Sequence, residues 1–202
     1  SMAYQSFNFK KLKEQFGIQP RLSPLFPQVQ PIAPSAWLTQ TLAISSATTL
    51  TTEKERSERI ISPILLELRE HNARQFSVLS GLVFDVDAEQ GLNGECDFIL
   101  SRHPFDFDIQ APVFTVVEAK KGDIESGLPQ CIAQMIAAEI FNFKDGTVLS
   151  AIYGAVTTGD VWRFLKLSGG AIDRDLQIDS ETHYLDNLPV VLGILQCIVE
   201  NV

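Results

Sequence analysis

Two charged side chains stand at the end of a strongly apolar segment. Residues 113–117 are Val, Phe, Thr, Val and Val, and Glu118 and Lys120 follow directly in the same segment. A run so rich in β-branched and aromatic residues predicts a strand that is buried on both faces. Side chains two positions apart on a strand share a face, so Glu118 and Lys120 should lie side by side. A carboxylate and an ammonium group at the exit of a buried strand need a partner or a chemical role.

A second carboxylate, Asp97, precedes Glu118 by 21 residues and falls in a separate segment, residues 95–100, that predicts another strand. Consecutive strands are usually neighbours in a sheet, which would place Asp97 beside Glu118. Two carboxylates so close together repel each other unless a cation lies between them. Mg2+ suits this position because it takes oxygen ligands and keeps several waters. We therefore expect Asp97, Glu118 and the backbone carbonyl of Ala119 to bind Mg2+, with Mn2+ as an alternative ion.

Lys120 would add a role that the ion alone does not supply. Its ammonium group can orient or activate an attacking water and can offset the charge that develops on phosphorus in the transition state. The reaction that these groups predict is the in-line hydrolysis of a phosphodiester. The alternative interpretation is that Glu118 and Lys120 form a structural ion pair and that Asp97 is a turn residue.

The elements around these residues follow from the spacing of apolar positions. Thr52 is the expected N-cap of a first helix, whose apolar stripe extends to Leu68 and contains Pro63. The other expected elements are strands at 75–86, 95–100, 113–120, 148–156 and 161–167 and helices at 128–143 and 188–199. The predicted order is therefore helix, three strands, helix, two strands and helix, with an acidic loop before the last helix. We predict a mixed α/β (α+β) fold with a central mixed sheet of about five strands flanked by helices.

Residues 1–52 differ in composition from the rest of the chain. They hold half of the prolines, and the prolines between residues 20 and 34 disfavour a regular helix or a central strand there. We expect an N-terminal arm, with a short helix at residues 9–16, that wraps over a domain formed by residues 53–202. The lysines near the start of this arm are expected to form a solvated face rather than a binding patch.

The order of the elements and the three charged residues together resemble the PD-(D/E)xK nuclease superfamily, which has the restriction-endonuclease-like fold. The resemblance covers residues 53–167 and implies a Mg2+-dependent nuclease. In such a protein Asp97 and Glu118 would bind the ion, and Lys120 would serve the attacking water. A Cys stands directly before Asp97 where the family name has Pro, and this departure makes Glu95 a second-choice acid at the site.

The resemblance also implies contributions from the two flanking helices. An acidic residue on the first helix often completes the site in this family. Glu58 matches it best because it lies closest to the apolar stripe when residues are placed about 100° apart, and Glu53 is the reserve. A Gln on the helix after the Glu-x-Lys strand often assists. Gln130 is preferred for this role over Gln134 because it is nearer to that strand in the sequence.

The net charge of -9 argues against a protein whose whole surface binds nucleic acid, since Lys and Arg drive phosphate binding. The acidic residues are concentrated in 75–112 and 171–202, however, and a site that collects metal-binding carboxylates is acidic by nature. The expected partner is nucleic acid, in particular DNA. Double-strand cutting would favour a homodimer, because each chain carries one such site.

Other features narrow the class of protein. No apolar stretch reaches the roughly 20 residues that a membrane-spanning helix needs. The three cysteines are widely spaced and indicate neither a disulfide framework nor a zinc site. We therefore expect a cytoplasmic protein without membrane association.

Two further functions remain as alternatives. One is a catalytically inactive protein of the same fold that binds nucleic acid or a protein partner without cutting, which the acidic total and the lack of an added DNA-reading domain favour. The same two observations also favour a nuclease that needs a partner subunit. The other alternative is a small-molecule enzyme that uses the carboxylates as acid and base. It is weaker because the sequence has no Gly-rich phosphate loop and no nucleophile constellation.

Overall fold

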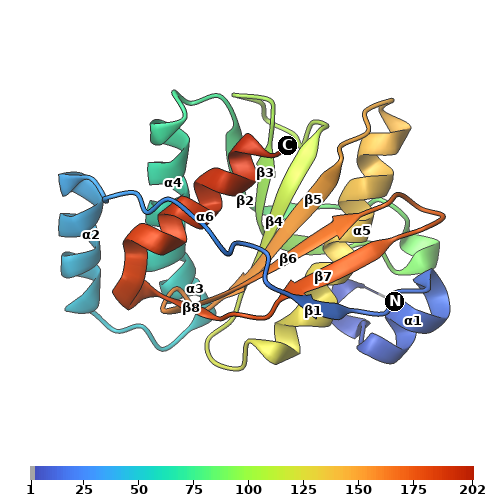
Figure 1. Cartoon of the computed structure of the whole chain (residues 1–202), viewed down its shortest axis with the longest axis horizontal. Helices are drawn as coiled ribbons and strands as arrows, with labels where there is room; N and C mark the ends of the chain where they lie inside the picture. Colours follow the sequence, from blue (N-terminus) through green and yellow to red (C-terminus); the bar gives the residue numbers. More distant parts are fainter. Residues whose placement is uncertain (1–2) are drawn as a thin grey trace.

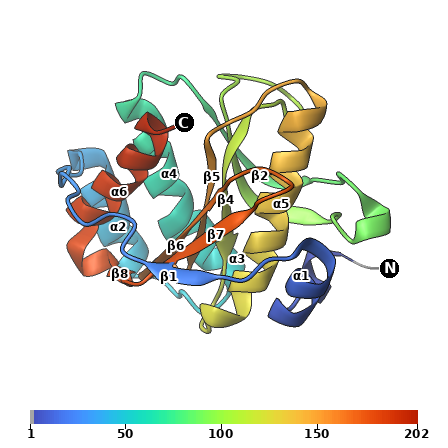
Figure 2. The ribbon, with the colours of Figure 1, turned by 45° about the vertical axis from the view of Figure 1, so that its right-hand side comes forward.

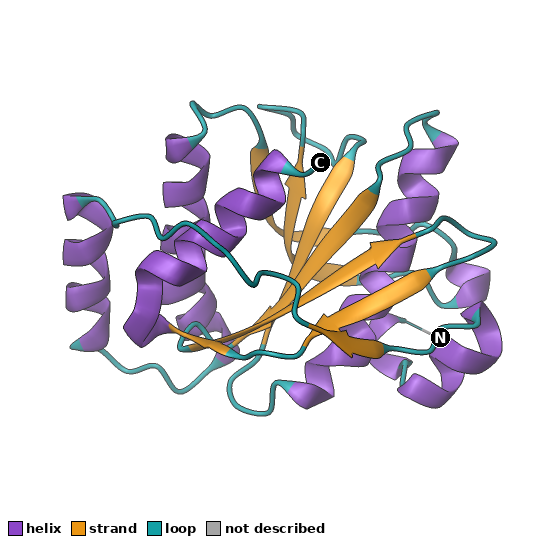
Figure 3. Cartoon of the chain, in the orientation of Figure 1, coloured by secondary structure: helices purple, strands orange, loops and turns teal. Residues whose placement is uncertain are grey.

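A computed structural model describes residues 3–202 of the chain. Its centre is an open mixed sheet of eight strands in the order β1-β7-β6-β5-β4-β3-β2, with β8 paired to β6 (Figures 1 and 3). The strands are β1 (Arg21–Ser23), β2 (Ser77–Val83), β3 (Glu95–Ser101), β4 (Val113–Ala119), β5 (Ala151–Thr157), β6 (Val161–Ser168), β7 (Asp175–Asp179) and β8 (His183–Tyr184). The α-helices are α1 (Phe9–Phe16), α2 (Ala36–Ser46), α3 (Glu53–Arg56), α4 (Ser62–His71), α5 (Leu128–Lys144) and α6 (Leu188–Glu200). The protein thus has the mixed α/β class expected from its sequence.

The directions of the central strands decide which residues can meet. β2, β3 and β4 are antiparallel neighbours, whereas β5 runs parallel to β4 and β6 runs antiparallel to β5. The C-terminal ends of β4 and β5 therefore lie at the same end of the sheet as the start of β3. Asp97, near the start of β3, and Glu118, near the end of β4, both lie at this end.

The prediction of about five strands was wrong, because the sheet extends beyond β6. β7 lies in the segment that we expected to be an acidic loop. In its sequence Asp-Leu-Gln-Ile-Asp, the half-buried Asp175 and Gln177 alternate with the buried Leu176 and Ile178, and Asp179 is also buried. Its acidic residues concealed this alternation. β1 was missed because prolines flank it at positions 20 and 24. A three-residue strand at the edge of a sheet tolerates such neighbours, since it needs few ladder hydrogen bonds.

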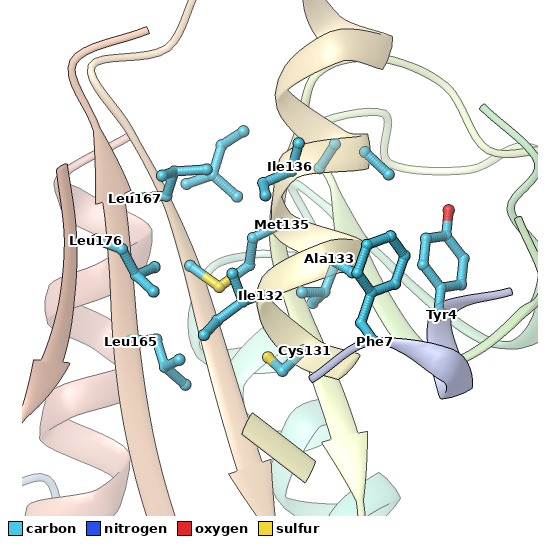
Figure 4. Packing of buried hydrophobic residues seen from close by; sticks show 14 of the residues in the cluster. Tyr4, Phe7, Cys131, Ile132, Ala133, Met135, Ile136, Leu165, Leu167 and Leu176 are labelled. Atoms are coloured by element: carbon cyan, nitrogen blue, oxygen red, sulfur yellow. The ribbon is translucent and has the colours of Figure 1, made fainter. Parts of the chain in front are cut away.

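Helices cover both faces of the sheet and form two hydrophobic cores (Figure 2). On one face α5 directs Ile132, Met135 and Ile136 toward Leu165 and Leu167 of β6 (Figure 4). On the other face α4 and α6 pack against the sheet, and α2 lies outside α4. Because both faces are covered, every residue of β4 is buried, as its apolar sequence predicted. Within residues 3–202, no helix is long and apolar enough to cross a membrane.

The N-terminal segment contributes side chains to the core beneath α5. The helix predicted at residues 9–16 is confirmed as α1, with Asn8 as its N-cap. Leu12 of this helix is fully buried, and the Tyr4 hydroxyl before it donates a hydrogen bond of 2.5 Å to the carbonyl of Phe84. α2 occupies a stretch of the same segment in which no helix was expected.

The predicted first helix is divided into three parts. Thr52 is its N-cap, as expected, and accepts a hydrogen bond from the N–H of Glu55 in a capping box. After α3 the chain forms a π-helical turn at Ser57–Ile61, and α4 then begins with Pro63 in its first turn. Proline has no N–H with which to form the next hydrogen bond of an α-helix. A change of helical pitch just before Pro63 means that this hydrogen bond is not needed.

Candidate active site

The adjoining ends of β3 and β4 position the two carboxylates expected at the site. Regular pairing between these strands stops at Phe98 and Val117. Beyond that point the Asp97 side chain replaces the backbone partner, and its Oδ2 accepts a hydrogen bond of 2.7 Å from the N–H of Ala119. The N–H and the carbonyl of one strand residue point to the same side. The Ala119 carbonyl therefore faces the Asp97 side of β4.

Glu118 is held in a buried position by the helix that follows. Its side chain lies on β4, and the residue is only 4% exposed. The Gln134 amide of α5 donates a hydrogen bond of 3.1 Å to its Oε2. The other end of that amide, Oε1, is buried and has no hydrogen-bond partner within the part of the chain that the structure describes. The carboxylate of Glu118 is thus fixed from the α5 face.

Lys120 leaves the sheet directly after β4. Its N–H donates to the carbonyl of Thr157, 2.9 Å away, which keeps the backbone aligned with β5. The ammonium Nζ lies 3.9 Å from Oε1 of Glu118, and the side chain keeps 20% of its exposure. Gly127 makes room for it, because a Cβ there would come within 3.0 Å of Cε of Lys120 and 2.7 Å of Cγ1 of Val156. The sequence prediction that Glu118 and Lys120 lie side by side agrees with this geometry.

The surroundings of Asp97 and Glu118 disfavour the ionised form of each carboxyl group. Burial and the neighbouring carboxyl group of Asp97 raise the pKa of Glu118 to about 8, although Gln134 and Lys120 act in the opposite direction. Burial also raises the pKa of Asp97. The hydrogen bond from Ala119 lowers this pKa, and the charge of Glu53 raises it by a smaller amount. Two acids whose ionised forms are both disfavoured form a place where a cation would be stabilised.

The donor atoms fit a small, hard cation. Asp97 and Glu118 supply carboxylate oxygens, and Ala119 supplies a carbonyl oxygen on the same side. Within residues 3–202, no three His, Cys, Asp or Glu side chains come close enough together to hold a metal ion. An ion here would therefore need the carbonyl and several waters to complete its shell. Mg2+ and Mn2+ accept such a shell, because oxygen ligands suit both and Mg2+ usually keeps several waters.

The first helix presents a different glutamate from the one preferred on sequence grounds. Glu58 is exposed and lies 3.9 Å from Lys54 in a surface ion pair. Glu53, the reserve candidate, is the helix residue whose charge raises the pKa of both Asp97 and Glu118. The π turn explains the difference. The count of 100° per residue holds for an α-helix, and a π turn of i→i+5 hydrogen bonds rotates less per residue.

The helix after β4 also uses a different residue from the one preferred. Gln130 is only half-buried, and its side chain makes no hydrogen bond to any residue in 3–202. Gln134, one helical turn further along α5, is fully buried and contacts Glu118. The choice by sequence distance failed because Gln134, and not Gln130, lies on the buried face of α5. Glu95, the second-choice acid, is exposed at the start of β3.

Two supporting residues had no place in the sequence prediction. Gly127 reads as an ordinary turn glycine, and only the close approach of Lys120 and Val156 shows why a side chain would not fit. Arg56 anchors the first helix at this end of the sheet by donating to the carbonyl of Thr158 at 2.9 Å and to Asp160 at 2.7 Å. An i, i+4 count on the helix could not have found these partners, since they lie in the turn between β5 and β6.

Comparison of the chain with protein-family models and with curated protein sequences gives no match. The functional inference therefore depends on the geometry of Asp97, Glu118, Lys120 and Gln134 and on the resemblance carried by the order of the elements.

Proposed function

We propose that this protein is a Mg2+-dependent nuclease that hydrolyses phosphodiester bonds, in DNA above all, and that its central part has the restriction-endonuclease-like fold. The observation that carries the proposal is the half-buried Asp97 and the buried Glu118 beside a partly exposed Lys120. A pair of acids whose ionisation is opposed by burial favours a divalent cation, and the ammonium group supplies the positive charge that phosphoryl chemistry needs.

The order of the strands supports the resemblance. β2, β3, β4, β5 and β6 lie side by side in chain order, with α5 between β4 and β5 in the sequence. Asp97 is on the second of these strands and Glu118 on the third, as in the family. The strands β1, β7 and β8 add to one side of this group and leave the site edge of β3 and β4 unchanged.

Each side chain then has a distinct task. Asp97 and Glu118 would hold the ion, which when bound would polarise the phosphate and the attacking water. Gln134 keeps the Glu118 carboxylate in place through its amide. Lys120 is close enough to Glu118 to be oriented by it and exposed enough to meet a phosphate that arrives from solvent. Its charge would offset the negative charge on phosphorus in the transition state.

The test is cleavage of supercoiled plasmid and of single-stranded DNA in the presence of Mg2+ or Mn2+. We expect metal-dependent products from the wild type, and we expect Lys120→Ala and Asp97→Ala to lower the rate by about 10²-fold or more. Lys121→Ala is the matched control, because Lys121 is an exposed neighbour that makes none of the contacts described for the site. Equal rates in the wild type, Lys120→Ala and Asp97→Ala would refute the assignment.

A protein of the same fold that binds without cutting is the second candidate. The pKa of about 8 for Glu118 favours it to the extent that a neutral carboxyl group binds no ion at neutral pH. Isothermal titration with Mn2+ distinguishes the two candidates by their metal binding. A nuclease should bind the ion in the wild type and lose this binding in Asp97→Ala. A wild type that neither binds Mn2+ nor cleaves any nucleic acid would favour the second candidate.

A further inference from the structure

An apolar cavity lies at the end of the sheet opposite to the candidate active site. It has a volume of about 520 Å3 and is bounded by the C-terminal part of α5, the connection to β5 and the tip of the β6–β7 hairpin. β5 begins there with Ala151, whereas its other end, at Thr157, adjoins Lys120. Nothing in the proposed nuclease chemistry uses this cavity. Its volume falls within the roughly 300–1,000 Å3 that is typical of sites for small molecules.

The walls of this cavity expose large apolar side chains. Phe143, Val148 and Ile172 line it and are 72%, 79% and 103% exposed. Ile140, Leu149, Ile152 and Leu167 form its deeper wall. Apolar groups gathered around a hollow are a costly arrangement in water unless an apolar occupant covers them.

The acidic and amide side chains of the cavity, Glu139 and Asn142, are already engaged within the protein. Glu139 is bound by Arg174, whose Nη2 lies 2.8 Å from its carboxylate. The Asn142 side chain exchanges two hydrogen bonds of 2.8 Å with the backbone of Val113. The Lys144 ammonium lies at the exposed rim, 3.5 Å from the carbonyl of Val86. A charged ligand inside the cavity would therefore find no free counter-charge among the deeper lining residues and would lose its hydration without compensation.

We propose that this cavity binds a small uncharged molecule that is mainly aliphatic or aromatic. The hydroxyl groups of Thr147 and Ser168, both half-buried in the lining, allow it one or two polar atoms such as a hydroxyl or a carbonyl. The proposal does not depend on the nuclease assignment, since the two sites lie at opposite ends of β5 and share no residue.

The test uses the full chain and the neutral fluorescent probe N-phenyl-1-naphthylamine, titrated at equilibrium. We expect saturable binding of one probe per chain. The double variant Val148→Asp/Ile172→Asp places charges at the mouth and should weaken binding at least about ten-fold. Ala171→Trp adds an apolar side chain to the lining and should also weaken it, by filling the space rather than by charge.

The matched control is Phe107→Asp, which alters an apolar side chain that is 87% exposed and lies outside the cavity. Its affinity for the probe should equal that of the wild type. The proposal fails if binding is not saturable, if the double variant binds as well as the wild type, or if Phe107→Asp loses as much affinity. It also fails if the protein sediments as a dimer that Val148→Asp/Ile172→Asp converts to a monomer, because a second copy would then cover this face.

Discussion

At the scale of single residues, the protonation state of Glu118 governs the candidate active site. Its pKa of about 8 lies above the ordinary value of 4.5, because burial and the nearby Asp97 disfavour the charged form. The folded protein therefore retains a proton that the unfolded chain loses between these two pH values. The resulting stabilisation is complete below pH 4.5 and is lost as the pH rises through 8.

Glu118→Gln should remove this dependence, because an amide does not ionise. We expect the free energy of unfolding of Glu118→Gln to rise relative to the wild type between pH 5 and pH 9, by on the order of 4 kcal/mol. Urea denaturation in metal-free buffer at several pH values measures it. Glu58→Gln is the control, since Glu58 is exposed, and its difference from the wild type should stay constant. A constant difference for Glu118→Gln as well would show that folding does not raise the pKa of Glu118.

Gln134 should tune how easily the site takes up an ion. Its hydrogen bond lowers the pKa of Glu118 against the effect of burial, so Gln134→Ala should raise that pKa further. A metal ion must displace the proton. We expect the pH at which Mn2+ binding is half-maximal to move upward in Gln134→Ala, as measured by isothermal titration from pH 6.5 to 9. Gln130→Ala, one turn earlier, should leave this pH unchanged, and an equal shift in both variants would contradict the role of Gln134.

At the scale of elements, the close approach of α5 to β5 sets the position of Gln134. Gly154 permits this approach, because a Cβ at that position would lie 2.5 Å from Sδ of Met135 and 2.8 Å from Sγ of Cys131. The helix can therefore rest directly on the strand, and the residue one position before Met135 on α5 reaches Glu118.

Gly154→Ala should force the two elements apart. We expect it to lower the free energy of unfolding by about 1–3 kcal/mol, the usual cost of overpacking a core. It should also weaken Mn2+ binding, since Gln134 moves with the helix. Chemical denaturation and isothermal titration measure the two effects. Gly122→Ala is the control, because a Cβ there meets no atom within 4 Å. Equal stability of the two variants would mean that α5 tolerates a larger separation.

At the scale of the whole molecule, the N-terminal segment and the central sheet share one core. Tyr4, Phe7, Leu12 and Ile18 belong to the same buried cluster as the apolar face of α5. Residues far apart in the sequence should therefore unfold together.

Leu12→Ala tests this shared core. Leu12 is fully buried, so its truncation should lower the free energy of unfolding by about 2–4 kcal/mol and keep a single transition. Phe9→Ala on the same helix removes a side chain that is 40% exposed and should cost less. Thermal unfolding followed by circular dichroism and by fluorescence gives both results. An unchanged midpoint for Leu12→Ala, or two separate transitions, would show that α1 folds independently of the sheet.

The sequence alone determined the features that depend on local pattern. The apolar run of β4 fixed its burial on both faces, and the period of two along a strand placed Glu118 beside Lys120. The spacing of apolar positions likewise predicted α5 and α6, and Thr52 was predicted as an N-cap. These features need no knowledge of distant parts of the chain, because they follow from the geometry of a single helix or strand.

Only the tertiary structure decided which helical residues influence the carboxylates. The charge of Glu53, rather than that of Glu58, raises their pKa values, because a π turn before Pro63 changes the rotation of the first helix. Gln134 rather than Gln130 contacts Glu118 because the depth of α5 against the sheet depends on Gly154, which lies on another element. The strand β1 was missed for a related reason: its partner β7 is far away in the sequence, and a short polar strand becomes stable only when a neighbour supplies its hydrogen bonds. β7 and β8 pair with the nearby β6, and they were missed because their short, polar sequences give a weak apolar pattern.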